Sequence, residues 1–418
     1  MNAASAVAID DRLAGHGGRL CVARALHPQA PQPWIDLSTG INPKPYPAPR
    51  ASSSSRARLP EPQELRALEE VAARAFGVAE QDCVVAVGGS EAALRLMPYV
   101  LQVDRAAIVG PTYSSHEDAW RKAGSCVDVV ERTHGLLIPS SPHPNPPPLR
   151  RGGSQLIDIP LNSQPRPFPC EAGEGQDGGA GFNHPHPRCA WMHEWRERRD
   201  AQERPPLRQG AGRQVITVVN PNNPDGAVLH RDRLLALHDQ LAQHDGYLVV
   251  DEAFADAAPA CSVASLAGSK RYPRLLVLRS FGKFYGLAGL RLGFVIAAPG
   301  IAQRFRSLLG DWPVTADAIA AGCAAYADAA WGERTRARLQ SAAHSLDALL
   351  VRSGFTLVGG TSLFRLARSN TAGRCFERLL DAGILVRPFD HDATLLRFGL
   401  PYGAPAWQRL TRALGAEA

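Results

Sequence analysis

The lysines of this chain offer few candidates for covalent amine chemistry. Lysine and arginine together number 46, but only four of these residues are lysines, so few amines could form a Schiff base. Lys44, Lys122 and Lys270 lie in polar or proline-containing segments that are typical of solvated positions. Lys283 instead lies in a glycine-rich segment after the apolar run 275–278, which is typical of a buried strand. We therefore expect Lys283 to be the reactive amine, although an ordinary strand and glycine turn has the same pattern.

A glycine turn supplies groups that could bind an anion. The expected strand 83–87 is followed by Gly88, Gly89, Ser90 and Glu91, and a helical pattern starts there. Backbone N–H groups at a helix N-terminus, together with a hydroxyl, can surround an anion such as a phosphate. A simple capped helix has the same sequence pattern, so both interpretations stay open.

Two chemically useful side chains follow apolar runs directly. Tyr113 comes after the expected strand 106–109, where its ring could stack on a flat ligand or pack against the rim of the sheet. Asp251 comes directly after the run 247–250, and a buried carboxylate needs a partner, unless it caps a helix. Asp251 precedes Lys283 by 32 positions, which leaves room for one β-α-β crossover.

The C-terminal part carries two arginines on short apolar strands. Arg387 and Arg397 lie in the expected strands 384–387 and 394–398. An unpaired guanidinium is unfavourable in such surroundings, so an anionic ligand or a protein carboxylate is expected beside each arginine.

The order of the elements predicts an α/β fold. Strands alternate with helices between about residues 64 and 300, and the helices at 301–353 are followed by short strands of a smaller α+β domain. The segment 137–212 is rich in proline, glycine and arginine with little periodicity, so we expect a mostly disordered surface insertion. Its cysteines and histidines match no familiar zinc spacing, and no metal site is expected.

Composition excludes several classes of protein. The 418 residues are 45% hydrophobic and 21% charged, as in globular proteins. The net charge of +6 comes from scattered arginines, which suits attraction of phosphorylated substrates better than nucleic-acid binding. Eight dispersed cysteines without a C-x-x-C pair indicate free thiols in a reducing compartment, and no segment resembles a signal peptide or membrane span. We therefore expect a cytoplasmic protein.

Together these motifs resemble the class I/II aminotransferase superfamily of fold type I enzymes, which use pyridoxal 5′-phosphate (PLP). The motifs are the glycine turn, Tyr113, the turn 220–226, Asp251, Lys283, Arg291 and Arg397, in the superfamily's order and approximate spacing. The branch that they resemble contains histidinol-phosphate aminotransferases and threonine-phosphate decarboxylases of cobalamin biosynthesis. Segments 16–18, 36–43 and 279–284 are similar to the decarboxylases.

The resemblance implies an architecture and a set of site residues. It implies an N-terminal arm at 1–46 that packs with the small domain, a large PLP-binding domain at 47–300 interrupted by 137–212, a small domain at 301–418, and a homodimer. Lys283 is expected to form the Schiff base and move protons. The expected cofactor contacts are Gly89, Ser90, Glu91, Tyr113, Asn223, Asp251, Ser280, Lys283 and Arg291. The expected substrate contacts are His16, Gly17, Asn42, Asn223, Arg387 and Arg397.

The implied activity is decarboxylation of L-threonine O-3-phosphate to (R)-1-amino-2-propanol O-2-phosphate and CO2. Aminotransfer of the histidinol-phosphate type is the alternative, because the same residues serve either reaction, and an inactive relative with a binding role is a further one. Three positions depart from the pattern of many relatives: Gly282 replaces a hydroxyl, Phe254 replaces a tyrosine, and Leu59 stands where a tyrosine reaches the neighbouring subunit's cofactor.

Overall fold

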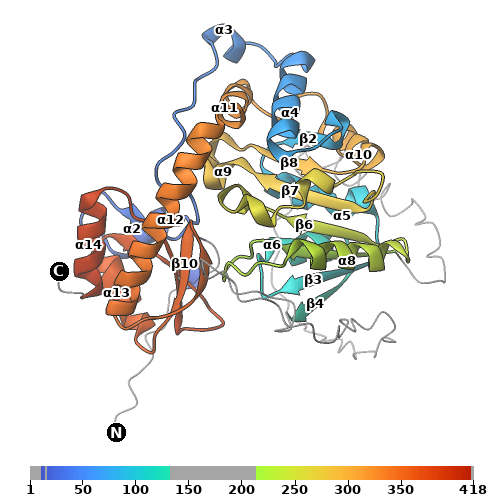
Figure 1. Ribbon diagram of the computed structural model, residues 1–418. Helices are drawn as coiled ribbons and strands as arrows, with labels where there is room; N and C mark the ends of the chain where they lie inside the picture. The colour runs from blue at the N-terminus through green and yellow to red at the C-terminus, as the bar shows by residue number, and fades with distance from the viewer. Residues whose placement is uncertain (1–10, 15–16, 132–212, 416–418) are drawn as a thin grey trace, which may run out of the picture. The chain divides into compact units, whose positions relative to one another are not determined.

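A seven-stranded sheet forms the centre of the fold. The computed structural model describes residues 11–14, 17–131 and 213–415, so the expected insertion at 137–212 lies outside the described residues. In spatial order the strands are β2 (Val84–Val87), β8 (Gly293–Ile296), β7 (Leu275–Ser280), β6 (Tyr247–Asp251), β5 (Gln214–Val219), β3 (Arg105–Gly110) and β4 (Cys126–Glu131). β8 runs antiparallel to both of its neighbours, β2 and β7, and all other adjacent pairs are parallel. The predicted mostly parallel α/β sheet is therefore confirmed (Figure 1).

Helices cover both faces of this sheet, as its strands require, because β2, β6 and β7 are buried along their whole length. One face packs against α5 (Ser90–Leu101), α6 (Ser115–Lys122) and α10 (Pro299–Leu309), through Met97, Trp120 and Phe305 among others. The opposite face carries α4 (Pro62–Phe76), α8 (Arg231–Ala242) and α11 (Ala316–Ala327). There the ring of Phe294 meets those of Phe76 and Tyr326 edge-on.

Smaller sheets follow in the C-terminal part. An antiparallel sheet has the order β12 (Arg387–Pro388), β13 (Leu395–Gly399), β10 (Phe364–Arg368) and β9 (Thr356–Thr361). Helices α12 (Ala329–Arg352), α13 (Ala372–Asp381) and α14 (Ala404–Leu414) accompany it (Figure 1). The N-terminal strand β1 (Ile35–Asp36) pairs in parallel with β11 (Ile384–Leu385). The remaining helices are α1 (Asp11–Ala14), α2 (Leu20–Leu26), α3 (Ser53–Arg56) and α9 (Phe281–Phe284).

The packing of two helices bears on the expected domain boundary. Helices α10 and α11 pack with α5 and α4 beside the large sheet, although both follow the expected boundary at residue 301. Their packing favours a boundary farther along the chain, in α12.

The pairing register of β12 and β13 sets Arg387 opposite Arg397, so the two arginines lie side by side on neighbouring strands.

The crossover between β6 and β7 contains three short 3-10 helices in place of an α-helix, at Ala255–Ala257, Pro259–Cys261 and Ala264–Leu266. A buried ion cluster holds it to the sheet. Arg279 donates to Glu252 at 2.9 Å and also bonds to Asp256. Glu252 is fully buried and accepts further bonds from the Ser262 hydroxyl at 2.5 Å and the Val263 N–H at 2.6 Å. Because Glu252 follows Asp251 and Arg279 precedes Ser280, the cluster fixes two strand ends together.

We expect Arg279→Met to lower the free energy of unfolding by about 3–5 kcal/mol, because Glu252 and Asp256 would stay buried without their cation. Urea unfolding followed by circular dichroism measures this change. Arg271→Met is the matched control, since Arg271 forms an exposed ion pair with Asp239 and should change the same quantity by less than about 1 kcal/mol. A loss for Arg279→Met as small as that of the control would contradict a supporting role for the cluster.

Candidate active site

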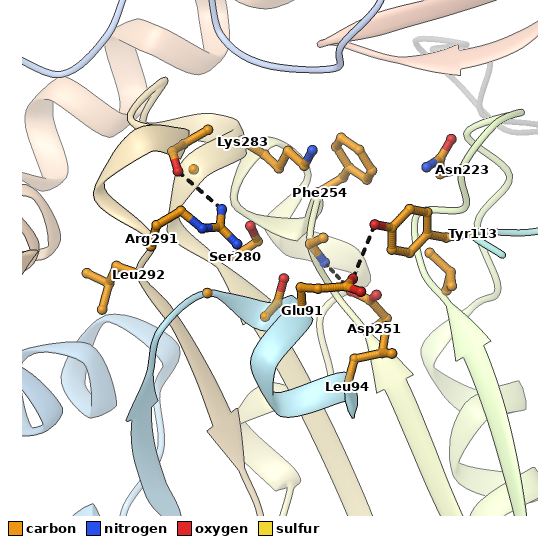
Figure 2. A pocket seen from close by; sticks show the side chains of 16 residues that line it. Glu91, Leu94, Tyr113, Asn223, Asp251, Phe254, Ser280, Lys283, Arg291 and Leu292 are labelled. Atoms are coloured by element: carbon orange, nitrogen blue, oxygen red, sulfur yellow. Dashed lines mark hydrogen bonds between the residues drawn. The ribbon is translucent and has the colours of Figure 1, made fainter. Parts of the chain in front are cut away.

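A cavity of about 160 Å³ lies at the carboxyl ends of the central strands. Its walls come from the residues that follow β2, β5, β6 and β7, together with Tyr113 after β3 (Figure 2). All these strands run in the same direction, so their ends meet at one edge of the sheet, where ligands bind in open α/β folds. Of the predicted cofactor contacts, all nine line this cavity: Gly89, Ser90, Glu91, Tyr113, Asn223, Asp251, Ser280, Lys283 and Arg291.

Lys283 lies in α9, directly after β7, and its amine faces the cavity (Figure 2). Burial first, and then the positive charges of nearby arginines, lower the pKa of this amine to about 8, against the opposing effect of Asp251. The amine nitrogen lies 5.8 Å from the centre of the Phe254 ring. Lys283 therefore provides a neutral, nucleophilic amine far more readily than a solvated lysine does. Lys44, Lys122 and Lys270 are exposed, as their surroundings in the sequence predict.

Asn42 bonds to the backbone of the helix that carries the lysine. Its backbone N–H donates to the Lys283 carbonyl at 2.9 Å, and its side-chain amide donates to the Phe284 carbonyl at 2.8 Å. Its side-chain oxygen accepts from the Lys44 N–H and the Arg338 guanidinium. Since the side chain is buried and bonded to protein on both ends, the structure uses it to hold α9. Asn42 is buried, and its expected contact with a substrate stays a prediction.

One end of the cavity has the donors that a phosphate needs. Gly89 has a φ of +91°, and a Cβ there would lie 2.7 Å from the Arg291 guanidinium. The glycine thus lets the guanidinium approach the N-terminus of α5, where the first N–H groups have no partner within the helix. The Ser280 hydroxyl lines the same region. Glycine, helix terminus, hydroxyl and guanidinium together fit the phosphate of PLP.

Close packing accounts for the missing hydroxyl at position 282. A Cβ on Gly282 would lie 2.7 Å from the Cα of Ala288, so the backbone around 288 occupies the space that a larger side chain needs. The phosphate end of the cavity therefore has Ser280 where many relatives have two hydroxyls. The other departures are also placed: Phe254 is buried edge-on to Phe364 at 5.1 Å, and Leu59 is exposed.

Asp251 has a partner that the sequence did not reveal. One carboxylate oxygen accepts from the Ala253 N–H at 3.0 Å, and the other lies 2.8 Å from Nε2 of His116. Both side chains are buried. His116 is in the first turn of α6, three positions after Tyr113, and β5 separates its strand from that of Asp251. The position of a histidine just after a parallel strand could have marked His116 as a candidate site residue. Its pairing with Asp251 could not be predicted, because it depends on the order of the strands in the sheet.

Asn223 connects the cavity to the two predicted arginines. Its side-chain oxygen accepts from Arg387 at 3.3 Å and from Arg397 at 2.5 Å. Because guanidinium groups only donate, the amide NH2 remains for an acceptor in the cavity. Asn223 can therefore face a ligand in the cavity while it bonds to both arginines.

Arg397 has the environment of a residue that awaits an anion. Its guanidinium is buried and also donates to the Ser38 carbonyl at 2.7 Å. Burial, and then the neighbouring charge of Arg387, lowers the pKa of Arg397 well below its usual value. Among the described residues no carboxylate lies within ion-pair distance of Arg397, and its Nε has no partner. Of the two partners expected from the sequence, an anionic ligand thus fits Arg397 better than a protein carboxylate.

The N-terminal candidates are described in part. His16 lies outside the described residues. Gly17 packs against the Ser38 carbonyl, which a Cβ would approach to 2.3 Å, and the Gly18 N–H donates to the Ser38 hydroxyl at 2.7 Å. Since the Ser38 carbonyl also accepts from Arg397, this segment lies beside that arginine.

Other expectations concern metals, thiols and membranes. The cysteine and histidine cluster of 170–193 lies outside the described residues, and among the residues that the structure describes no three ligand side chains gather around a point. The six cysteines that the structure describes are free thiols. In the same part of the chain, no helix combines the length and apolar character needed to span a membrane.

Comparisons with known proteins agree with this geometry. Residues 198–418 match the model of the family "Aminotransferase class I and II". The chain is 33% identical to threonine-phosphate decarboxylase of Pseudomonas aeruginosa, over 96% of each protein, and 32% identical to that of a Sinorhizobium species, over 96% of this chain and 97% of the relative. Its fold is similar to the crystal structure of histidinol-phosphate aminotransferase from Clostridium acetobutylicum, with a TM-score of 0.65, 17% identity, and coverage of 91% of this chain and 98% of the other.

The lowered pKa of Lys283 predicts how the cofactor-free protein captures PLP. Only the neutral amine attacks an aldehyde, so the rate of capture should rise with pH through a midpoint near 8. Stopped-flow absorbance measures this rate through the visible band that appears when PLP binds to the lysine, and Lys283→Ala should abolish this band. Lys270→Ala, at an exposed lysine, is the matched control and should leave the profile unchanged. A midpoint near 10.5, the ordinary value of a lysine, would contradict the buried environment that we describe.

Proposed function

Because the chain belongs to the class I and II aminotransferase family, and within it to the group of threonine-phosphate decarboxylases, we propose that it decarboxylates L-threonine O-3-phosphate. The products are (R)-1-amino-2-propanol O-2-phosphate and CO2, in a step of cobalamin biosynthesis. The observation that carries this proposal is the 33% identity over 96% of both chains. The pair of arginines on Asn223 supports it, because the substrate has two anionic groups.

The cofactor is PLP, which withdraws electrons from the bond that breaks at the substrate's α-carbon. In our proposal Lys283 holds it covalently and Asp251, backed by His116, keeps the ring nitrogen protonated. The amide NH2 of Asn223 donates to the phenolic oxygen, and Tyr113 covers the ring. Ser280, Arg291 and the N-terminus of α5, at Gly89, Ser90 and Glu91, bind the phosphate.

The substrate is held from the side of the small antiparallel sheet. Arg387 and Arg397 lie opposite each other on β12 and β13, so one pair of strands presents two cations to the substrate's carboxylate and phosphate. Gly17 packs beside them through Ser38, and we propose that His16 contributes from the same segment.

Reaction choice depends on which bond at the α-carbon these arginines turn perpendicular to the cofactor plane. A decarboxylase presents the carboxylate, which leaves as CO2, and the α-carbon then takes up a proton. We propose that the Lys283 amine, once the substrate's own amine has replaced it on the cofactor, would deliver that proton, because a pKa near the working pH favours proton transfer. An aminotransferase would instead present the hydrogen to the same amine.

Assembly and location are part of the proposal. We infer a homodimer, as in the family that the chain resembles, and a cytoplasmic setting, since a phosphorylated amino acid is the substrate. Light scattering tests the dimer: twice the chain mass supports it and a single chain mass contradicts it.

We expect the purified protein, loaded with PLP, to release CO2 and 1-amino-2-propanol O-2-phosphate from O-phosphothreonine without any keto acid. Mass spectrometry and a coupled CO2 assay measure both products, and Lys283→Ala should show neither. Amino-group transfer from histidinol phosphate to 2-oxoglutarate, without CO2 release from O-phosphothreonine, would identify an aminotransferase instead. PLP binding without either reaction would favour a binding role.

Arg397→Met should lower kcat/KM for O-phosphothreonine by about 100-fold, because a charge-assisted bond to the substrate is lost from a buried position. Steady-state kinetics measures this loss, and unchanged capture of PLP would locate the defect at the substrate. Arg409→Met is the control, since Arg409 is only partly buried and bonds only to the Pro33 carbonyl among the described residues. Equal kinetics for the Arg397 variant and its control would contradict the role of Arg397.

A further inference from the structure

Glu91 is the unexpected residue at the phosphate end of the cavity. It is the second residue of α5, whose N-terminus faces the expected phosphate, and its carboxylate would repel that anion if it pointed there. The structure turns the carboxylate elsewhere. Its Oε2 accepts the hydroxyl of Tyr113 at 3.2 Å, and its Oε1 accepts from Nε of Arg95 at 2.9 Å (Figure 2 shows the first bond).

The ring of Tyr113 is held on two sides. Its hydroxyl end bonds to Glu91, and its edge meets the imidazole of His116 with the ring centres 6.2 Å apart and the planes at 86°. His116 in turn bonds to Asp251. Tyr113 thus lies between the helix that binds the phosphate and the histidine that supports the ring-nitrogen carboxylate, so its tilt is tied to both ends of the expected cofactor.

A second connection keeps Glu91 in place. Arg95 bonds to Glu91 and, through Nη1, to Asp118 of α6 at 2.5 Å. Because Tyr113 lies in the loop just before α6, the same arginine joins the helix that carries Glu91 to the helix that follows the tyrosine. Arg95 also neutralises a carboxylate that would otherwise weaken anion binding at the N-terminus of α5.

We propose that the side chain of Glu91 is a positioning residue that fixes the tilt of Tyr113 over the cofactor, while only its backbone N–H serves the phosphate. The inference rests on the proposed use of PLP. It assigns opposite roles to two parts of one residue: the backbone attracts the anion, and the carboxylate acts through the tyrosine hydroxyl.

A double-mutant cycle tests this coupling with the full chain. The variants are Glu91→Ala, Tyr113→Phe and the double variant, and Glu91→Gln keeps an acceptor for the hydroxyl. Fluorescence titration gives the Kd for PLP, and visible circular dichroism reports the tilt of the bound ring. Glu117→Gln is the matched control, because Glu117 of α6 pairs with the exposed Arg121.

We expect Glu91→Ala and Tyr113→Phe each to weaken PLP binding about 3- to 10-fold and to reduce the dichroic band similarly. The double variant should be no worse than Tyr113→Phe alone, since the two changes remove the same bond. Glu91→Gln should stay within about 2-fold of the unmodified chain.

Two results would overturn the inference. Tighter PLP binding by Glu91→Ala would show that the carboxylate only repels the phosphate, and multiplied losses in the double variant would show that the residues act independently. If Glu91→Ala does not fold, Tyr113→Phe tests the inference by itself. An unchanged dichroic band in that variant contradicts the inference. Failure of the unmodified chain to bind PLP would instead overturn the proposed function and this inference with it.

Discussion

Positive charge gathered around one amine is the constraint on which this site depends. Lys283 shares its surroundings with the guanidiniums of Arg291, Arg387 and Arg397, and burial removes the water that would screen them. The amine therefore gives up its proton readily, and the same cations attract a substrate with two anionic groups. Asp251 is the carboxylate that opposes these charges at Lys283, and its bond to His116 holds it in place.

The fold satisfies this constraint by joining two sheets at one asparagine. Asn223 belongs to the turn after β5, whereas the arginines that it binds lie on β12 and β13. The turn also meets β9 closely, because a Cβ on Gly226 would approach the Gly360 carbonyl to 2.1 Å. Glycine at 226 is thus needed both for its φ of +71° and for this backbone contact. The cofactor side and the substrate side of the site are consequently parts of one packed unit.

The sequence was most informative where chemistry follows a strand directly. Lys283, Asp251 and Tyr113 each stand after an apolar run, and parallel strand ends necessarily meet at one edge, so their convergence could be predicted. His116 could not be paired with Asp251 without the strand order. The bonds of Asn42 to the backbone of α9 could not be predicted either, because an amide in a turn gives no sign of which helix it holds. The sequence after Asp251 likewise predicted the length of the crossover but not its 3-10 conformation, which the buried bonds of Arg279 accompany.

The segment from Leu37 to Tyr46 connects strands β11 and β13 to the helix that carries the lysine. Leu37 bonds to Leu385 and Gly399 at one end, and at the other Asn42 bonds to the Lys283 carbonyl and Tyr46 to that of Tyr285. Between them Gly40 packs closely against the rings of Phe254 and Phe364, which leaves this segment little room to move. Any displacement of the strand that carries Arg397 therefore pulls on the backbone of Lys283. The position of β13 and that of the amine are thus linked along the chain itself, independently of any ligand.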